Sequence, residues 1–579
     1  MFGTKQTVAD QFVEVLVQAG VERIYGLVGD SLNSLSDAIR RSGAIEWVHV
    51  HNEEAAAFAA SAEAQLTGRL AVCAGSCGPG NTHLIQGIFD AHRSGAPVLA
   101  IASHIVSSEI GTGFFQETDP KQLFGQASHW TELVSSAEQM PRLARVGIQE
   151  ALGKRGAAVL VVPGDVFGAK AVNETGTAHR PAGPVLGAPS PEVIDELAER
   201  INAAEKVAIF GGIGCAGARD EVLQLAEVLA APVGHSLRGK ESLQYDNPYD
   251  VGMSGLLGYG ACYQASHEAD LLLLLGTDFP YRQFLPGKNT VQVDIDPSRL
   301  GRRTPLDQGV AGDVGATIRA LLPKLDRKKR AFLDRMLAKH TEELERVVGA
   351  YTHDVEHLTP IHPEYVASIL DEEAAADAIF TADTGMCCSW IARYITPNGH
   401  RRLLGSWVHG TMANALPQAL GAQKTFPGRQ VVSMSGDGGL AMLLGELLTA
   451  KLHNLPVKVV VFNNSSLGMV RLEMLVAGDP PFETDHEAVD FAAIARGAGI
   501  HGVRVEKPAE VRQAMREFLA HDGPAVLDVV TDPNALELPP HVTTEEAAGF
   551  ALAIGRTVLG GGVGQMLHLA RTNLRNIPR

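Results

Sequence analysis

Two polar motifs, Gly436-Asp437-Gly438 and Asn463-Asn464, have the residue types and spacing of a cation site. The segments before them, 430–434 and 457–462, are apolar runs typical of buried parallel strands, with a helical pattern over 443–452 between them. The motifs would then follow neighbouring strands, where a carboxylate and a carboxamide can bind one Mg²⁺ through oxygen and leave positions open for phosphate. The glycines would let the backbone approach a diphosphate. A chance pair of loop turns is the alternative.

A second carboxylate, Glu53, stands where an expected strand leads into an expected helix. Asn52-Glu53-Glu54 is followed by residues 55–60, five alanines and a phenylalanine, which favour helix. A buried carboxylate in such a place can exchange a proton with a bound group rather than with water. Acidic residues at a helix N-terminus are also favoured by the helix dipole alone, so the residues by themselves leave both interpretations open.

Strand and helix patterns alternate along three segments, which is typical of parallel sheets covered by helices. A loop rich in Gly, Pro and Thr at 176–191 predicts a linker, and 326–348 is a charged helical stretch. We predict an α/β protein of three consecutive parallel-sheet domains plus a C-terminal helical tail. The expected segments are 1–180, 192–335, 360–532 and, for the tail, 533–579. Strands before the polar motifs are expected at 23–28, 70–73, 97–101, 158–162, 207–210, 271–275 and 291–295.

Composition and charge limit the classes of function that the chain can have. The chain has 579 residues, 45% of them hydrophobic and 20% charged, which suits globular domains with large cores. The net charge of −17 argues against nucleic acid as a partner. Six cysteines without CxxC spacing are expected to be reduced thiols. No apolar run approaches the ~18 residues of a membrane span, and the N-terminus has no signal-peptide pattern, so we expect a cytoplasmic protein.

The sequence resembles the thiamine-diphosphate (ThDP) enzymes over nearly its whole length, and among them most closely the bacterial quinone-linked pyruvate oxidases. The resemblance rests on the motifs above and on Ala71-Val-Cys-Ala-Gly-Ser-Cys-Gly-Pro-Gly-Asn81, Asp246-Asn-Pro-Tyr-Asp-Val-Gly-Met253 and Met412-Ala-Asn-Ala415. It implies oxidative decarboxylation of pyruvate to acetate and CO₂, with electrons passed from a ThDP-bound enamine to FAD and then to a membrane quinone. It also implies a homotetramer, with ThDP between the first segment of one subunit and the third of another.

Other activities remain open on this evidence. The alternatives are an acetohydroxyacid synthase, a phosphate- and oxygen-dependent pyruvate oxidase, and a catalytically silent scaffold that kept the fold.

The resemblance assigns roles to individual residues. Glu53 would hydrogen-bond the pyrimidine ring of ThDP and favour the imino tautomer that removes the thiazolium C2 proton. Relatives have His-Glu here and this chain has Asn52-Glu53, so either His49 or His51 replaces that histidine or none is needed. Met412 would lie under ThDP and bend it, and Met469 stands where relatives often have an aromatic residue. The expected ligands of Mg²⁺ are Asp437, Asn464 and the carbonyl of Ser466. The expected ThDP contacts are Glu53, Gly410, Thr411, Met412, Asp437, Gly438, Gly439, Asn464, Ser465, Ser466, Leu467, Gly468, Met469 and Val470. Pyruvate is expected at His92, Phe115, Gln116 and Glu473.

The second segment is expected to hold a nucleotide. Gly212-Ile-Gly-Cys-Ala-Gly217 matches the GxGxxG pattern of dinucleotide-binding folds, but the motif is short and lies in a middle segment. The resemblance implies FAD instead, or an empty vestigial domain as the alternative. An acidic residue at a strand end suits a ribose hydroxyl, and basic residues can offset diphosphate charge. The expected FAD contacts are Arg238, Lys240, Ser254, Gly255, Leu256, Leu257, Thr277, Asp278, Phe279, Pro280, Tyr281 and Asp294.

The tail combines an amphipathic pattern with a reversal of charge. Thr543 and Glu546 predict a capping box for a helix to about Leu559, and a second helix is expected from about Val563. Its apolar face would carry Val563, Met566, Leu567, Ala570 and Leu574, and its basic face His568, Arg571 and Arg575. After Glu546 the chain has four arginines and no acidic residue, which favours an anionic lipid surface at the inner face of the cell membrane. A helix docked on the body or on a neighbouring subunit is the alternative.

Overall fold

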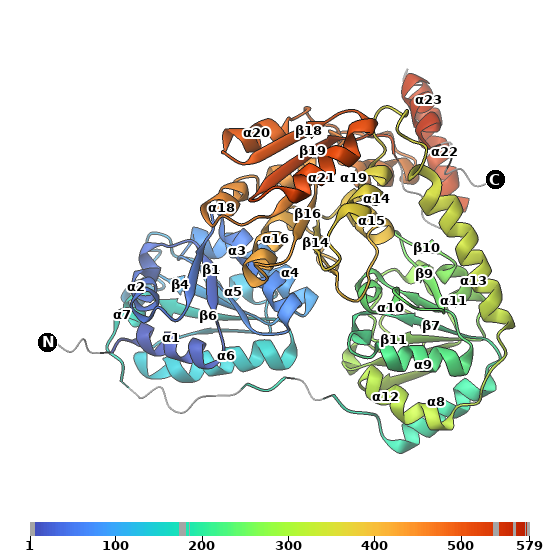
Figure 1. Cartoon of the computed structure of the whole chain (residues 1–579). Helices are drawn as coiled ribbons and strands as arrows, with labels where there is room; N and C mark the ends of the chain where they lie inside the picture. Colours follow the sequence, from blue (N-terminus) through green and yellow to red (C-terminus); the bar gives the residue numbers. More distant parts are fainter. Residues whose placement is uncertain are drawn as a thin grey trace.

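The computed structural model describes residues 6–172, 181–183, 186–535, 544–559, 563–573 and 575. Along this part of the chain, three open sheets follow one another, each with helices packed on its faces (Figure 1). The predicted α/β class with three parallel-sheet domains is confirmed. In Figure 1 the first domain lies at the lower left, the central domain at the right, and the third domain above and between them.

The first domain has a sheet with strand order β2-β1-β3-β4-β6-β5, and all its described pairings are parallel. Its central strands are buried along their whole length, which explains their continuous apolar sequences. The strands are β1 Arg23–Gly26, β2 Glu46–His49, β3 Ala71–Gly75, β4 Val98–His104, β5 Trp130–Leu133 and β6 Ala157–Pro163. The helices are α1 Val8–Gln18, α2 Asn33–Ser42, α3 Glu53–Thr67, α4 Pro79–Ser94, α5 Pro120–Phe124, α6 Met140–Lys154 and α7 Gly164–Gly168.

The central domain has the order β10-β9-β8-β7-β11-β12-β13, with β10 antiparallel to β9 and the other described pairings parallel. Its strands are β7 Val207–Gly211, β8 Val233–His235, β9 Asp250–Met253, β10 Tyr259–Gly260, β11 Leu271–Leu275, β12 Thr290–Asp294 and β13 Gln308–Ala311. Its helices are α8 Pro191–Ala203, α9 Arg219–Leu229, α10 Lys240–Leu243, α11 Cys262–Glu268 and α12 Val314–Leu321. Helix α13, Ala331–Glu343, then leads to the third domain.

The third domain has the order β15-β14-β16-β17-β19-β18, again parallel. Strands β16 and β17 are neighbours, with Gly436 opposite Phe462, so both polar motifs lie at one edge of the sheet as predicted. The strands are β14 Ile379–Ala382, β15 Arg402–Gly405, β16 Val431–Gly436, β17 Lys458–Asn463, β18 His501–Val505 and β19 Ala525–Val530. The helices are α14 Pro363–Glu373, α15 Met386–Tyr394, α16 Ala415–Thr425, α17 Asp437–Met442, α18 Glu446–Leu452, α19 Gly468–Ala477, α20 Phe491–Gly497 and α21 Val511–Ala520.

The helix expected at 443–452 begins three residues later, as α18 at Glu446, and a separate helix, α17, precedes it over Asp437–Met442. The first and third domains meet through α3 and α16. A Cβ added to Gly421 would lie only 2.2 Å from the carbonyl oxygen of Ala59, so the small residues of α3 allow the two helices to touch. Asn52 caps α3 by accepting from the amide of Glu54 at 2.9 Å, and Gly68 ends it with φ of 69°.

The tail forms α22, Thr544–Leu559, and α23, Val563–Thr572, at the upper right of Figure 1. Ala553 of α22 and Leu569 of α23 pack in one apolar cluster with Leu472 and Leu475 of α19. The tail is therefore docked on the third domain, which was the alternative to a free amphipathic tail. The predicted capping box lies outside the residues whose side chains are described.

The docked face of α23 is neither of the two expected faces. Leu569, Thr572 and Asn573 are buried, whereas Leu567 is 55% exposed. Arg556 donates to the carbonyl of Gly478 at 2.7 Å, and the guanidinium of Arg575 reaches the carbonyls of Ala350, His353 and Asp354.

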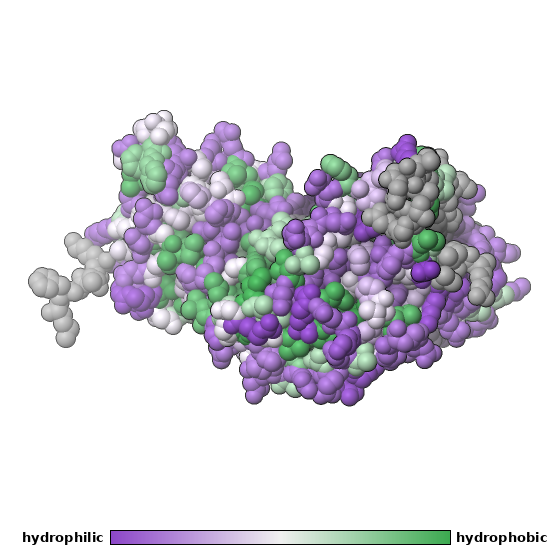
Figure 2. Space-filling view, turned by 90° about the horizontal axis from the view of Figure 1, so that it is seen from above, coloured by the Kyte–Doolittle hydropathy of each residue, from purple (hydrophilic) through white to green (hydrophobic). Residues whose placement is uncertain are grey.

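Polar residues dominate the face shown in Figure 2, and its apolar residues gather mainly in the middle of the view and at the upper left. In the part of the chain that the structure describes, none of the helices combines the length and the apolar character needed to cross a bilayer.

Candidate active site

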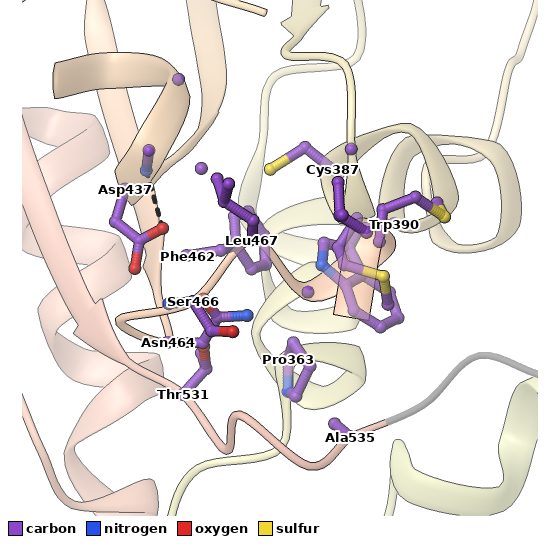
Figure 3. Close-up of a pocket in the computed structure, with 18 of the residues that line it drawn as sticks. Pro363, Cys387, Trp390, Asp437, Phe462, Asn464, Ser466, Leu467, Thr531 and Ala535 are labelled. Carbon is purple, nitrogen blue, oxygen red and sulfur yellow. Dashed lines mark hydrogen bonds between the residues drawn. The ribbon is translucent and has the colours of Figure 1, made fainter. Parts of the chain in front are cut away.

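A pocket with a cavity volume of about 70 Å³ opens at the carboxyl edge of the third sheet. Figure 3 shows Asp437 on one side of it and Cys387 and Trp390 on the other. Of the expected ThDP contacts, the following line this pocket: Met412, Asp437, Gly438, Gly439, Asn464, Ser466, Leu467, Gly468, Met469 and Val470. Gly410, Thr411 and Ser465 lie within two residues of lining residues in the chain, and Glu53 lies in the first domain. Most of the expected ThDP contacts thus lie around one pocket, and their role in binding ThDP stays a prediction.

Helix N-termini converge on the pocket. Thr384 to Cys387, around the start of α15, and Leu467 to Val470, around the start of α19, both line it, as does the turn that begins α17 at Asp437. The free amides and the dipoles of such ends favour phosphate groups. The hydroxyl of Thr384 is buried, and within the described chain it has no hydrogen-bond partner. These features fit a diphosphate, as the resemblance implies.

Asp437 and Asn464 lie on the two neighbouring turns, as a shared cation requires. The carboxylate of Asp437 is 3% exposed and accepts from the amides of Gly438 at 2.7 Å and Ser465 at 2.5 Å. Burial raises the pKa of Asp437, so a nearby cation would stabilise its charged form. The carboxamide oxygen of Asn464 accepts from the amide of Ser466 at 2.9 Å.

The donor set suits a hard cation with oxygen ligands. Among the described residues, no cluster of three or more His, Cys, Asp or Glu side chains could hold a metal. Asn463, the other half of the Asn-Asn motif, is structural: it donates to Asp528 and to the carbonyl of Val489, each at 2.8 Å.

Asp383 connects two segments of the pocket and was not identified from the sequence. Its carboxylate accepts from the amide of Ala415 at 3.0 Å, just beyond Met412. A Cβ on Gly439 would lie 2.4 Å from the other carboxylate oxygen, so only glycine fits at this position. Burial raises the pKa of Asp383 to about 7. No local pattern marks this residue, because its contacts come from segments distant in sequence.

Glu53 is buried at the start of α3, with 4% of its surface exposed. Its partner is His83 of α4, whose Nδ1 lies 2.9 Å from Glu53 Oε2. Neither of the two histidines considered from the sequence takes this place. His51 Nδ1 lies 2.8 Å from Thr449 Oγ1, and the carbonyl of His49 pairs with His453. In this chain Asn52 caps the helix, and His83 is the hydrogen-bond partner of Glu53.

Within one chain, the four expected substrate residues do not lie together in one site. His92 stacks edge-on against His129 at 4.4 Å, and burial lowers its pKa to about 4. Phe115 is 77% exposed, and Gln116, with φ of 63°, accepts from the thiol of Cys77. Glu473 is exposed on α19. Their role in binding substrate stays a prediction.

Two of the predicted flavin segments meet at the carboxyl edge of the central sheet. A Cβ on Gly255 would lie 2.9 Å from the ring of Phe279 and 3.6 Å from that of Tyr281. The remaining residues of the two segments, Ser254, Leu256, Leu257, Thr277, Asp278 and Pro280, follow the ends of β9 and β11. The hydroxyl of Ser254 is buried and, within the described residues, has no partner, which fits a bound polar group. Asp294 is 3% exposed at the end of β12, and burial raises its pKa.

The GxGxxG match has a structural cause. Gly212 and Gly214 pack against the turn after β11, where added Cβ atoms would lie 2.6 Å from Gly276 backbone atoms. The glycines therefore allow the turns after β7 and β11 to approach each other. The order of the strands in the sheet reverses between these two strands. Ligands of open parallel sheets bind at such a point.

Two predicted flavin contacts are engaged elsewhere in the protein. Arg238 donates to the carbonyl of Ser94 at the end of α4, at 2.6 Å. Lys240 is fully buried, with its ammonium 2.5 Å from Gln244 and 3.4 Å from the hydroxyl of Tyr259. Burial lowers the pKa of Lys240 to about 8. Their role toward a diphosphate stays a prediction.

Comparison with protein families agrees with this geometry. The N-terminal TPP binding domain of the thiamine pyrophosphate enzymes matches residues 6–123, their central domain 194–321 and their C-terminal TPP binding domain 383–529. The chain belongs to the thiamine pyrophosphate enzymes. Thiamine pyrophosphate is ThDP under its other name.

Individual relatives cover almost the whole chain. The Bacillus subtilis protein YdaP is 36% identical over 94% of this chain and 95% of its own length. An acetolactate synthase of Oryza sativa is 31% identical over 92% of this chain and 85% of its own. The pyruvate oxidase of Lactiplantibacillus plantarum is 28% identical over 91% and 89%.

Proposed function

We propose that the protein oxidatively decarboxylates pyruvate with ThDP, Mg²⁺ and FAD and passes the electrons to a membrane quinone. Pyruvate and water give acetate, CO₂, two protons and two electrons. The similarity to a pyruvate oxidase supports the substrate.

The observation that carries the proposal is a contact between the third domain and the predicted flavin segment 254–257. Arg393 of α15 donates to the carbonyl of Gly258 at 2.9 Å and to that of Leu257 at 3.4 Å. The N-terminal turn of the same helix lines the ThDP pocket. A flavin held by this segment would therefore lie near the thiamine site, as electron transfer between them requires.

Each protein group has a distinct task in this scheme. When bound, ThDP supplies a carbanion and an electron sink, and FAD accepts two electrons. Glu53, held by His83, exchanges a proton with the pyrimidine ring. Asp437 and Asn464 hold the cation that binds the diphosphate. The apolar side chains of the pocket, Trp390, Phe462, Leu467 and Pro363, exclude water from the reacting carbon.

We further propose that the working enzyme is an oligomer, a homotetramer by the resemblance, in which the first domain of one copy meets the third domain of another. Glu53 is not among the residues that line the pocket of its own chain. His83 is half exposed beside it, so this part of the first domain faces outward. A second copy can bring the carboxylate to the pocket.

The test is anaerobic addition of pyruvate to the purified holoenzyme. We expect the yellow flavin band to bleach, with one acetate and one CO₂ released per flavin reduced. Unchanged absorbance with pyruvate would refute the proposal, and bleaching in a Glu53→Gln variant at the rate of the parent would remove Glu53 from its role.

An acetolactate synthase activity is the second candidate, because a synthase of this kind is 31% identical to the chain. Acetolactate formation from two pyruvate molecules, with the flavin still oxidised, would favour it. Acetyl phosphate and hydrogen peroxide as products would instead indicate a phosphate- and oxygen-dependent oxidase.

Contact with an anionic membrane through the tail is also a proposal. Leu567 and Arg571 of α23 are exposed on the docked tail, and support such a contact. Deletion of residues 563–579 should reduce quinone turnover with liposomes more than turnover with a soluble dye. Equal losses would make the tail a structural element only.

A further inference from the structure

Asp90 is a buried carboxylate where the first and third domains meet. It lies on α4, is fully buried, and faces groups from both domains. One oxygen accepts from the hydroxyl of Ser406 in the third domain at 2.7 Å. The other accepts from Ser61 of α3 at 3.3 Å and from Gln418 of α16 at 3.4 Å. A buried carboxylate destabilises the folded protein unless hydrogen-bond donors surround it. These three donors therefore hold the carboxylate of Asp90 in place.

Ser406 connects Asp90 to the loop that carries Met412. Its hydroxyl oxygen accepts from the amides of Gly410 at 3.1 Å and Thr411 at 3.2 Å, while its hydrogen goes to Asp90. Because the hydroxyl donates its hydrogen to the carboxylate of Asp90, its oxygen is free to accept hydrogen bonds from both amides. The loop 406–412 is therefore fixed from its first residue to its last turn.

Helix α4 makes two more contacts with the same loop. Gln86 donates to the hydroxyl of Thr411 at 2.7 Å, and Phe89 stacks on His409 with ring centres 5.4 Å apart. Ala413, which follows Met412, has φ of 68°, a conformation that a residue with a side chain holds only when its surroundings impose it. The position of Met412 thus depends on contacts outside its own segment.

We propose that Asp90 is a positioning residue for the cofactor: through Ser406 it fixes the loop 406–412 and so the place of Met412 in the ThDP pocket. The inference rests on the proposed binding of ThDP against Met412. It adds a division of labour between subunits, because α4 of a chain shapes the pocket of that same chain, while Glu53 at the start of α3 serves a partner copy.

The test compares Ser406→Ala with Ser61→Ala in the stripped full-length enzyme with Mg²⁺. Both changes remove a hydroxyl from Asp90, but only Ser406 touches the loop. We expect Ser406→Ala to weaken ThDP binding about tenfold, as for loss of a hydrogen bond to a charged group, and Ser61→Ala to stay within about twofold. Amide hydrogen exchange at residue 411 should accelerate only in Ser406→Ala, whereas the amide of Gly410 keeps the carbonyl of Ser406 as its acceptor at 2.8 Å. Ser406→Thr, which keeps the hydroxyl, should restore both ThDP binding and the exchange rate at residue 411.

Equal ThDP affinity in Ser406→Ala and the parent would overturn the proposal, and so would equal losses in the two alanine variants. If Ser406→Ala fails to fold, Asp90→Asn, which keeps the shape and removes the charge, decides by the same measurements: weaker ThDP binding supports the proposal and unchanged binding overturns it. A parent enzyme that binds no ThDP would instead contradict the proposed function itself.

Discussion

The hydrogen bond between His83 and Glu53 gives a prediction that the sequence did not contain. His83 Nδ1 lies 2.9 Å from Glu53 Oε2, and the carboxylate is buried while the imidazole is half exposed. Because His83 is partly in water, its bond is worth the usual net value of about 1 kcal/mol rather than that of a fully buried pair. His83→Ala should therefore slow the steps that depend on Glu53 about fivefold.

The assay is pyruvate-dependent flavin reduction in a stopped-flow instrument, with ThDP affinity measured separately by calorimetry. Two variants serve as controls. His83→Asn keeps an N–H donor and should lose less than His83→Ala. His51→Ala should leave the rate unchanged within about twofold, because His51 pairs with Thr449 instead. A rate of His83→Ala equal to that of the parent, or an equal loss in His51→Ala, would refute the assignment of His83 as the partner of Glu53.

Three further changes test the third domain. Gly439→Ala should lower both the Tm and ThDP affinity, because the new Cβ would lie 2.4 Å from Asp383; a normal melting curve with normal titration would contradict the packing. Asp437→Ala should abolish Mg²⁺-dependent ThDP binding without lowering the Tm of the stripped enzyme, since a buried carboxylate is removed. Burial raises the pKa of Glu446 from 4.5 to about 7, so its contribution to stability is complete below about pH 4.5 and is lost as the pH rises through 7. Glu446→Gln should thus be more stable than the parent at pH 8 by roughly 1–3 kcal/mol, and no more stable at pH 4.5, in denaturant titrations.

The fold, and the meeting of the two polar motifs at one edge of the third sheet, were predictable because their signals are local. Buried parallel strands have continuous apolar sequences, and the two polar motifs follow strands that prove to be neighbours, β16 and β17. Asp437 and Asn464 are therefore brought together by topology alone. The same reasoning placed Glu53 at the start of a helix, where Asn52 caps it.

Residues that pair with partners far away in the sequence could not be predicted from it. His83 is thirty residues from Glu53, and Asp90 reaches Ser406 over 316 residues, so no spacing marks either pair. Burial also cannot be read from residue type: Lys240 suited a diphosphate by charge, yet its ammonium lies in the core of the central domain against Tyr259. The docked face of the tail could not be predicted from apolar spacing, because it buries the polar residues Thr572 and Asn573, which donate to Asp532 and to the carbonyl of Asn534.

The most direct test of the whole account is calorimetric titration of ThDP into the stripped enzyme, with and without Mg²⁺. We expect one ThDP site per chain in the presence of Mg²⁺, and we expect this site to be lost when Asp437 is replaced by alanine. Heat that does not depend on Mg²⁺, or binding that survives the loss of Asp437, would contradict it.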